Sequence, residues 1–270
     1  MWLTVEHVTR FSYDGSINEA YSEIRLKPAH RDGQRCSSFV LVTEPRGVSV
    51  SEYRDRFGNT VHHFDILEPH QTLGLTARSE VWTPEAFVDD EAEPSLLDRW
   101  DLLRQSRYVA LDGSIAALAA HVDAVAGPSL ATATAVMHAV RGAMTYETGS
   151  THVRTVADEA LSAGHGVCQD FAHVMIGVCR LHGIPARYVS GYLFDPKATG
   201  NGNSASHAWV DIWDPDRGWV SLDPTHDREQ TARYVRVGVG RDYADVPPTR
   251  GVYKGKAKEQ LDVAVRIREP

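Results

Sequence analysis

Three residues of this 270-residue chain have the types and the order needed for nucleophilic catalysis: a cysteine, then a histidine, then an aspartate. Cys168 follows a turn with glycines at positions 164 and 166 and precedes the apolar segment 171–181. That segment is too long for an ordinary buried strand, so we expect a helix with Cys168 in its first turn. Unpaired N–H groups at a helix start stabilise an anion, and thiolate is the nucleophilic form of cysteine. We therefore predict that Cys168 is catalytic.

The histidine and the aspartate are spaced to activate that thiol. Residues 206–213 and 219–223 alternate as strands do, and the turn 214–218 joins them. His207 and Asp223 have the same parity. They face each other directly if residues 213 and 217 are paired, and a shift of two makes them diagonal neighbours that still touch. If the helix packs on this hairpin, its start brings the thiol to the free ring nitrogen, which gives a Cys–His–Asp relay.

The same residues are also compatible with a structural cysteine or a metal site. A lone cysteine near a helix start is commonly structural, and the same fold could serve a non-enzymatic peptide-binding or scaffolding protein. A zinc site could use His165, Cys168 and His173, which lie close in sequence. On a helix, however, Cys168 and His173 are about 140° apart. Because a second ligand pair at finger-like spacing is missing, the sequence favours the catalytic hypothesis.

The predicted helix must be a central one, because it is apolar nearly all round. Cys179 shares the face of Cys168 but lies roughly 16 Å further along the axis, so these two cannot form a disulfide. With Cys36 they make no disulfide framework. We expect Cys179 to be a core residue and the chain to occupy a reducing, cytoplasmic setting.

Composition and charge limit the classes of partner that we expect. The net charge of −8 argues against nucleic acid, and the sequence begins with no secretory signal and contains no apolar run long enough to cross a membrane. No acidic loop has the pattern of a calcium site. We expect a peptide or protein substrate, no membrane partner, and no cofactor or metal.

The elements around the site predict an α+β protein. Regular short strands over residues 1–85 indicate a sandwich-like all-β domain. Residues 86–110 predict a linker in which Asp89, Asp90 and Glu91 are solvated. Residues 111–270 predict the catalytic core with a C-terminal extension, built as a central helix packed on an antiparallel sheet. The expected N-terminal strands are 3–13, 19–26, 38–43, 48–53, 60–66 and 73–82. The expected helices before the cysteine are 94–103, 114–125, 129–144 and 155–161.

Several stretches also resemble the bacterial transglutaminase-like superfamily. The core stretches are Gly166-Val167-Cys168-Gln169-Asp170-Phe171-Ala172-His173, 183–192, Ser206-His207-Ala208-Trp209-Val210 and 218–225. Residues 7–13, 26–28 and 55–59 are similar to the β region fused to this core in bacteria, and 240–248 also fits that architecture. The resemblance implies a papain-like core, with the family's Cys, His and Asp at Cys168, His207 and Asp223.

The resemblance also implies acyl chemistry through Cys168, with water or an amine as the acceptor. The backbone N–H of Cys168 is a natural oxyanion donor. Tyr146 is a candidate for the second donor. Gln169, a candidate for substrate or oxyanion binding, stands where many relatives carry arginine. Trp209 and Trp219 are candidates for the walls of the site, although core packing is an alternative for at least one. We expect the loop 195–205 to lie near the site.

Overall fold

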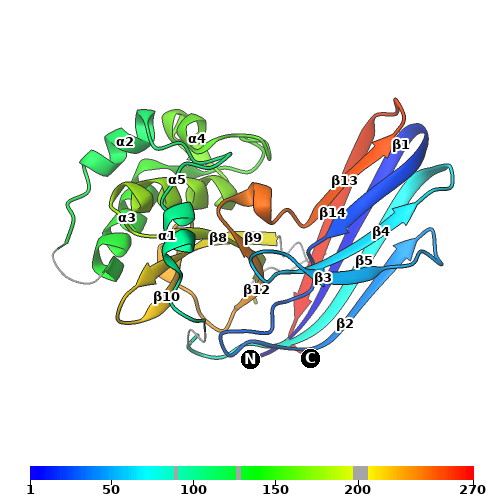
Figure 1. Cartoon of the computed structure of the whole chain (residues 1–270), viewed down its shortest axis with the longest axis horizontal. Coiled ribbons are helices and arrows are strands. Elements are labelled where there is room, and N and C mark those ends of the chain that lie inside the picture. Colours follow the sequence, from blue (N-terminus) through cyan, green and yellow to red (C-terminus); the bar gives the residue numbers. More distant parts are fainter. Residues whose placement is uncertain (88–90, 126–128, 197–205) are drawn as a thin grey trace.

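Helix α5 (Cys168–Leu181) is the centre of the helical half of the molecule. The computed structural model describes residues 1–87, 91–125, 129–196 and 206–270. Every residue of α5 from Gln169 to Arg180 is buried. The helix packs against strands β8 (Ala186–Leu193) and β9 (Ser206–Asp214) and against helices α2 (Gly113–Ala120), α3 (Ser129–Ala143) and α4 (Ala157–Ala163) (Figure 1). The predicted central helix is confirmed.

A five-stranded antiparallel sheet lies against α5 and positions the histidine and the aspartate. Its order is β11-β10-β9-β8-β12, with β10 (Gly218–Asp223), β11 (Arg228–Glu229) and β12 (Tyr234–Gly240). Trp213 pairs with Trp219 across β9 and β10. This register is the second of the two predicted, and it makes His207 and Asp223 diagonal neighbours. Strand β12, which was not among the predicted strands, pairs with β8 and closes the other edge.

The N-terminal half is a sandwich built on one long strand, β1 (Trp2–Ile24). Four more strands follow it in the sequence: β2 (Arg35–Glu44), β3 (Ser51–Arg54), β4 (Thr60–Ile66) and β5 (His70–Trp82). In space these five strands have the order β2-β5-β1-β4-β3. From Leu3 to Thr9 of β1, every second residue is buried, as the alternating sequence predicts. Buried residues such as Ile17, Phe64 and Leu75 fill the interior of this half. The predicted sandwich-like domain is confirmed.

The end of the chain belongs to this N-terminal half, and the predicted extension of the core is wrong for these residues. Strand β13 (Thr249–Lys254) pairs with the second part of β1, and β14 (Glu259–Arg268) pairs with the first part. Both are antiparallel to β1, and Figure 1 shows the last strands (red) beside the first (blue). Local patterns do not predict this pairing, because it joins residues that are more than 220 positions apart.

The expected linker is anchored rather than solvated. It contains helix α1 (Leu96–Leu102), as predicted. Glu91 is paired with Arg187 at 2.6 Å and with Arg31 at 3.1 Å. Its expected solvation is therefore wrong, because two arginines of the two halves bind its carboxylate. Asp89 and Asp90 lie outside the described residues, as does the expected loop from residue 197 to 205.

The two halves share an apolar interface and a buried histidine. Leu3 and Val5 of β1 pack with Tyr192 and Val235 of the core sheet. His7 completes this interface: its Nδ1 atom lies 3.0 Å from the Tyr192 hydroxyl. Burial lowers the pKa of His7 to about 4, so the ring is neutral at neutral pH. The halves therefore meet through an apolar contact that contains a neutral histidine.

Candidate active site

Cys168 is the first residue of α5, and a rigid turn holds it there. Helix α4 ends at Gly164, whose φ of 72° is the left-handed conformation that glycine adopts freely. The Asp170 carboxylate accepts hydrogen bonds from the Val167 N–H at 2.8 Å and the Thr151 hydroxyl at 2.6 Å. A Cβ at Gly166 would lie 2.7 Å from that carboxylate, so the turn requires glycine. The predicted position of Cys168 in the first helical turn is confirmed, and the thiol is half-buried and free.

His207 connects Cys168 to Asp223. It lies at the start of β9 with its side chain 8 % exposed, and its Nε2 atom is 2.8 Å from Oδ2 of Asp223. Burial lowers the pKa of His207, but the hydrogen bonds to Asp223 and Cys168, together with the negative charges of both, raise the pKa to about 10. The imidazole is thus held as imidazolium at neutral pH.

Asp223 is fully buried, yet both of its oxygens are satisfied. Oδ2 receives the Tyr234 hydroxyl at 2.6 Å and lies 2.8 Å from Nδ1 of His226, in addition to its contact with His207. Oδ1 accepts the backbone N–H of Thr225 at 2.9 Å. Burial raises the pKa of Asp223, but the hydrogen bonds from His207 and His226 outweigh it and hold that pKa well below its usual range. The carboxylate therefore stays charged and fixed.

Tyr234 and His226 are members of this site that were not predicted from the sequence. His226 follows Asp223 by three residues in the same turn, and this spacing is a signal that could have identified it. Tyr234 begins β12, the strand that was not predicted, so its approach to Asp223 depends on a long-range pairing.

Trp209 supports the histidine from inside the core. It has no exposed surface, and its ring is stacked 6.1 Å from that of His207. A Cβ at Gly191 would lie 2.5 Å from the indole, so the sheet leaves room for this side chain only with glycine there. Trp209 is thus placed beneath His207 rather than on a wall of the site. Trp219 lies at the other end of β10, against Trp213 and under the Arg187 guanidinium, so it does not line the site.

Tyr146 and Gln169 both lie near the thiol. Strand β6 (Thr145–Tyr146) pairs in parallel with β7 (His165–Gly166), which places Tyr146 opposite Gly166. The pKa of Tyr146 is raised by burial and by the negative charge of Cys168. The Gln169 amide donates to the Val153 carbonyl at 3.3 Å and so fastens the loop in front of α5. Direct roles for these two residues in substrate or oxyanion binding stay predictions.

A layer of aromatic rings covers the other side of α5. His173 lies between Tyr108 and Tyr188, stacked on the first and tilted against the second, with ring centroids 5.2 Å from each. Its Nε2 atom accepts the backbone N–H of Tyr243, in the short helix η1 (Tyr243–Asp245). Burial raises the pKa of Tyr188 well above its usual value, and the negative charge of Cys168 adds to the effect. These rings therefore connect the thiol to η1.

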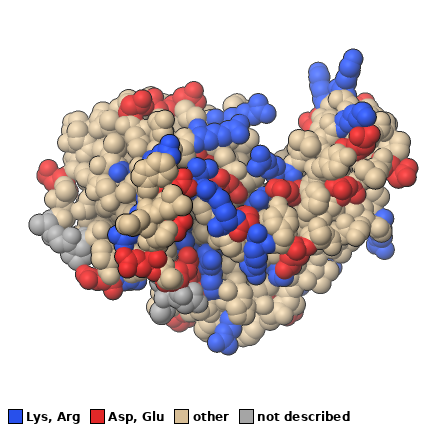
Figure 2. All heavy atoms as spheres, in the orientation of Figure 1, with Lys and Arg blue, Asp and Glu red and all other residues tan. Residues whose placement is uncertain are grey.

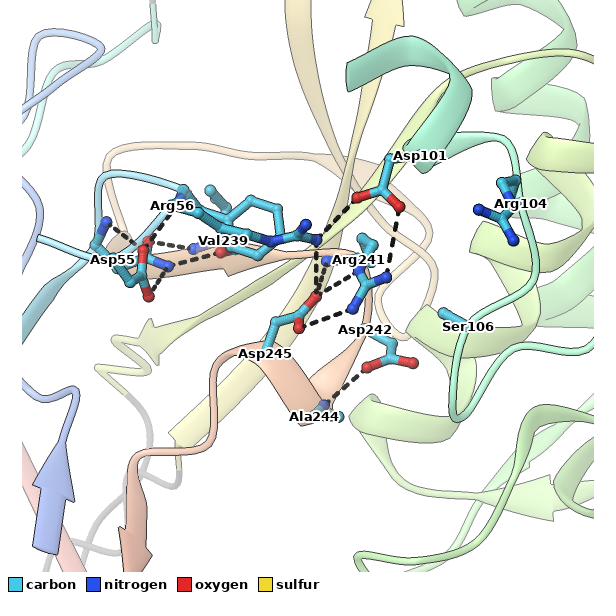
Figure 3. A network of polar contacts seen from close by, with 12 residues as sticks. Asp55, Arg56, Asp101, Arg104, Ser106, Val239, Arg241, Asp242, Ala244 and Asp245 are labelled. Atoms are coloured by element: carbon cyan, nitrogen blue, oxygen red, sulfur yellow. Dashed lines mark hydrogen bonds and ion pairs between the residues drawn. The ribbon is translucent and has the colours of Figure 1, made fainter. Parts of the chain in front are cut away.

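A polar network holds η1 in place (Figure 3). Arg241 is paired with Asp245 at 2.9 Å and with Asp101 of α1 at 3.4 Å. Arg56, from the N-terminal half, reaches the same Asp101 at 2.8 Å. Asp242 accepts the N–H of Ala244 at 2.8 Å. Two other segments of the chain, around Arg56 and Asp101, thus help to fix the segment that carries Tyr243.

Metal binding at the proposed zinc residues does not fit this geometry. His173 is enclosed between tyrosine rings, and the described residues hold one group of three potential metal ligands: His207, Asp223 and His226. In that group the two histidines are already bonded to the carboxylate, as described above.

None of the helices in the described ranges is long and apolar enough to span a membrane.

A central helix on an antiparallel sheet, with a cysteine at the helix start and a His–Asp pair on the sheet, is a papain-like arrangement. Residues 116–224 match the transglutaminase-like superfamily, and residues 3–82 match the bacterial transglutaminase-like N-terminal region. The chain belongs to the transglutaminase-like superfamily.

Two relatives and one solved structure are similar to this chain. The uncharacterized protein ML0607 of Mycobacterium leprae is 35% identical, over 99% of this chain and 99% of its own. The protein-glutamine gamma-glutamyltransferase of Pseudomonas aeruginosa is 33% identical over 42% of this chain and 18% of its own length. A putative cysteine protease from Cytophaga hutchinsonii has the same fold, with a TM-score of 0.77 and 20% identity over 100% of this chain and 91% of that one.

Proposed function

We propose that the protein is a cysteine-dependent acyl enzyme that acts on peptide or side-chain amide bonds. Cys168 is the nucleophile, His207 the acid and base, and Asp223 the group that orients His207. The observation that carries this proposal is the position of His207, which bonds to Asp223 and Cys168 and whose pKa those partners raise to about 10 although burial lowers it. An imidazolium beside a thiol favours the thiolate, the reactive form.

In the first half of the reaction the Cys168 sulfur attacks the carbonyl carbon of the amide. The C–N bond breaks, His207 gives its proton to the leaving amine, and the acyl group remains on sulfur as a thioester. The backbone N–H of Cys168 has no acceptor among the described residues and is free to bind the developing oxyanion. In the second half, water or an amine attacks the thioester, loses a proton to His207, and releases the thiol.

The geometry serves hydrolysis and transamidation equally, because the two differ only in the acceptor. The two named relatives support one outcome each, since one is named a protease and the other a glutamyltransferase. An assay with dimethylated casein and a fluorescent primary amine separates the outcomes: incorporation of the amine marks transfer, and casein fragments mark hydrolysis. Either product must disappear in Cys168→Ala.

The test of the proposal is the pH dependence of Cys168 alkylation by iodoacetamide, with Cys36→Ser as the background so that Cys168 is the accessible thiol. We expect a fast reaction that persists well below the ordinary thiol pKa of about 8.5 and is lost in His207→Ala. Cys179 is buried, and burial raises its pKa to about 12, so it does not interfere. An ordinary thiol profile in both proteins would contradict the proposal and favour a non-enzymatic peptide-binding protein.

A further inference from the structure

A cleft of about 390 Å³ lies between the sandwich and the helical half. One wall is formed by β1, β13 and β14, and the other by the segments around Arg107, Arg154 and Tyr243. Figure 2 shows the molecule hollowed between its two halves, with basic side chains gathered there. Apolar surface is also open in it: Val153 is 60 % exposed and Val252 is 69 % exposed. The cleft therefore offers both charge and apolar contact.

Two residues that line the cleft contact residues of the candidate site. The Val153 carbonyl accepts the side-chain hydrogen bond of Gln169, the residue next to Cys168. Tyr243 has its ring 6.2 Å from that of Tyr188, whose hydroxyl responds to the charge of Cys168. The lining of the cleft is thus in contact with Gln169, which adjoins Cys168 in the chain, and with Tyr188.

The charges of the cleft oppose those of the chain as a whole. Its lining includes Arg107, Arg154 and Arg250 but a single carboxylate, Glu259, whereas the protein carries a net charge of −8. Arg107 and Arg154 are exposed, and no carboxylate of the described ranges lies within 4.0 Å of either. Two unpaired guanidinium groups at an apolar groove fit carboxylates on a partner that also presents apolar side chains.

The sandwich wall of the cleft is a face of the sheet. Phe11 of β1 is paired with Leu73 of β5 on one side and with Leu261 of β14 on the other, and all three residues line the cleft. An extended segment that lies on this face presents its side chains alternately to the apolar wall and to the arginines across the cleft.

We propose that this cleft binds an extended acidic segment of the protein substrate and presents a neighbouring carbonyl to Cys168. The inference rests on the proposed function for the fate of the bound segment, but not for binding itself. It assigns the sandwich a role in substrate selection: the two walls of the cleft come from different halves, so neither half forms it alone.

The test measures binding without chemistry, on the full chain carrying Cys168→Ala. Two fluorescein-labelled heptapeptides serve as probes, Glu-Glu-Leu-Gln-Leu-Glu-Glu and Lys-Lys-Leu-Gln-Leu-Lys-Lys, with fluorescence anisotropy as the readout. We expect the acidic peptide to bind at least about tenfold more tightly than the basic one, and less tightly as salt rises. R107Q/R154Q should weaken acidic-peptide binding by about tenfold, the size expected for two exposed charge pairs. R35Q/R46Q, which removes two exposed arginines of β2 and the turn after it, is the matched control and should bind as before.

Three results would overturn the inference: equal binding of both peptides, no binding of either at millimolar concentration, or equal effects of the two double variants. The thermal midpoint of each variant checks that it is folded. A parallel measurement locates the site, because the acidic peptide should slow iodoacetamide alkylation of Cys168 in the wild type. Selective binding together with an unreactive Cys168 would support this inference and contradict the proposed function. A reactive Cys168 without selective binding would support the proposed function and contradict this inference.

Discussion

Nδ1 of His226 lies 2.8 Å from Oδ2 of Asp223, the same oxygen that holds Nε2 of His207 at 2.8 Å. The two histidine rings meet edge to face, with centroids 5.2 Å apart. Since Asp223 itself is fully buried, His226 is its half-exposed cover on the solvent side. One carboxylate therefore orients His207 while a second histidine holds the carboxylate.

Removal of that second histidine should slow acylation. In His226→Ala the Asp223 carboxylate loses a hydrogen bond and gains contact with water, so we expect kcat/KM to fall by about three- to tenfold, equivalent to the net contribution of one typical hydrogen bond. His226→Asn can place its amide near the lost Nδ1 position and should recover most of the rate. The exposed His121→Ala is the control. If Asn and Ala variants are equally impaired, the hydrogen bond is not the cause.

Neutralising Asp223 should lower the pKa of His207. Burial favours the neutral ring, and Asp223 is one of the two partners that oppose burial. In Asp223→Asn we expect the pKa to fall from about 10 and the alkylation rate of Cys168 at pH 7 to drop by about tenfold or more, since each pKa unit is a factor of ten. The pH profile of alkylation is the measurement. Asp227→Asn, an exposed exchange at a residue paired with His138, should leave the profile unchanged.

A methyl group at residue 191 should disturb both the fold and the site. A Cβ there would lie 2.2 Å from the Val235 carbonyl and 2.5 Å from the Trp209 ring that supports His207. We expect Gly191→Ala to lose about 3 kcal/mol or more of unfolding free energy, because backbone cannot yield as a side chain does. Gly142→Ala is the control, with open space around its Cβ in α3. The measurement is denaturant unfolding of both variants. Equal midpoints for Gly191→Ala and Gly142→Ala would contradict the prediction.

The interface histidine predicts acid sensitivity. His7 has a pKa of about 4 when folded and about 6.5 when unfolded, so between these values the unfolded chain binds more protons. Stability is therefore greatest above pH 6.5 and falls as the pH drops toward 4, by about 3 kcal/mol for this group. Urea unfolding across this range should show a shallower fall in His7→Gln than in wild type. The exposed His30→Gln should keep the wild-type slope, and three equal slopes would exclude this origin.

Local signals in the sequence predicted the central part of the site. The glycine turn and apolar run around Cys168 specify a helix start whatever surrounds them, and the parity of His207 and Asp223 limits the hairpin to registers that bring them together. Tyr234 could not be placed in this way. It reaches Asp223 because β12 pairs with β8, across a sheet edge that hairpin spacing does not determine.

The same division applies to the fold. Strands 60–66 and 73–82 and the helix after Ser129 follow from alternation and periodicity, and they lie where these patterns predict. The destination of β13 and β14 does not follow from them, because a strand pattern states which residues are extended but not which partner they meet. Burial of Trp209 was likewise decided by Gly191, a neighbour on another strand.

The pairing of the last strands with the first has a consequence for synthesis. While the chain leaves the ribosome, β1 has neither β13 nor β14, and the edge of β1 opposite β4 and β5 stays open until residue 268 has emerged. The helical half, between them in the sequence, can form earlier. The nascent sandwich therefore keeps an exposed strand edge until β13 and β14 pair with β1. A truncated fragment ending near residue 85 should aggregate for that reason.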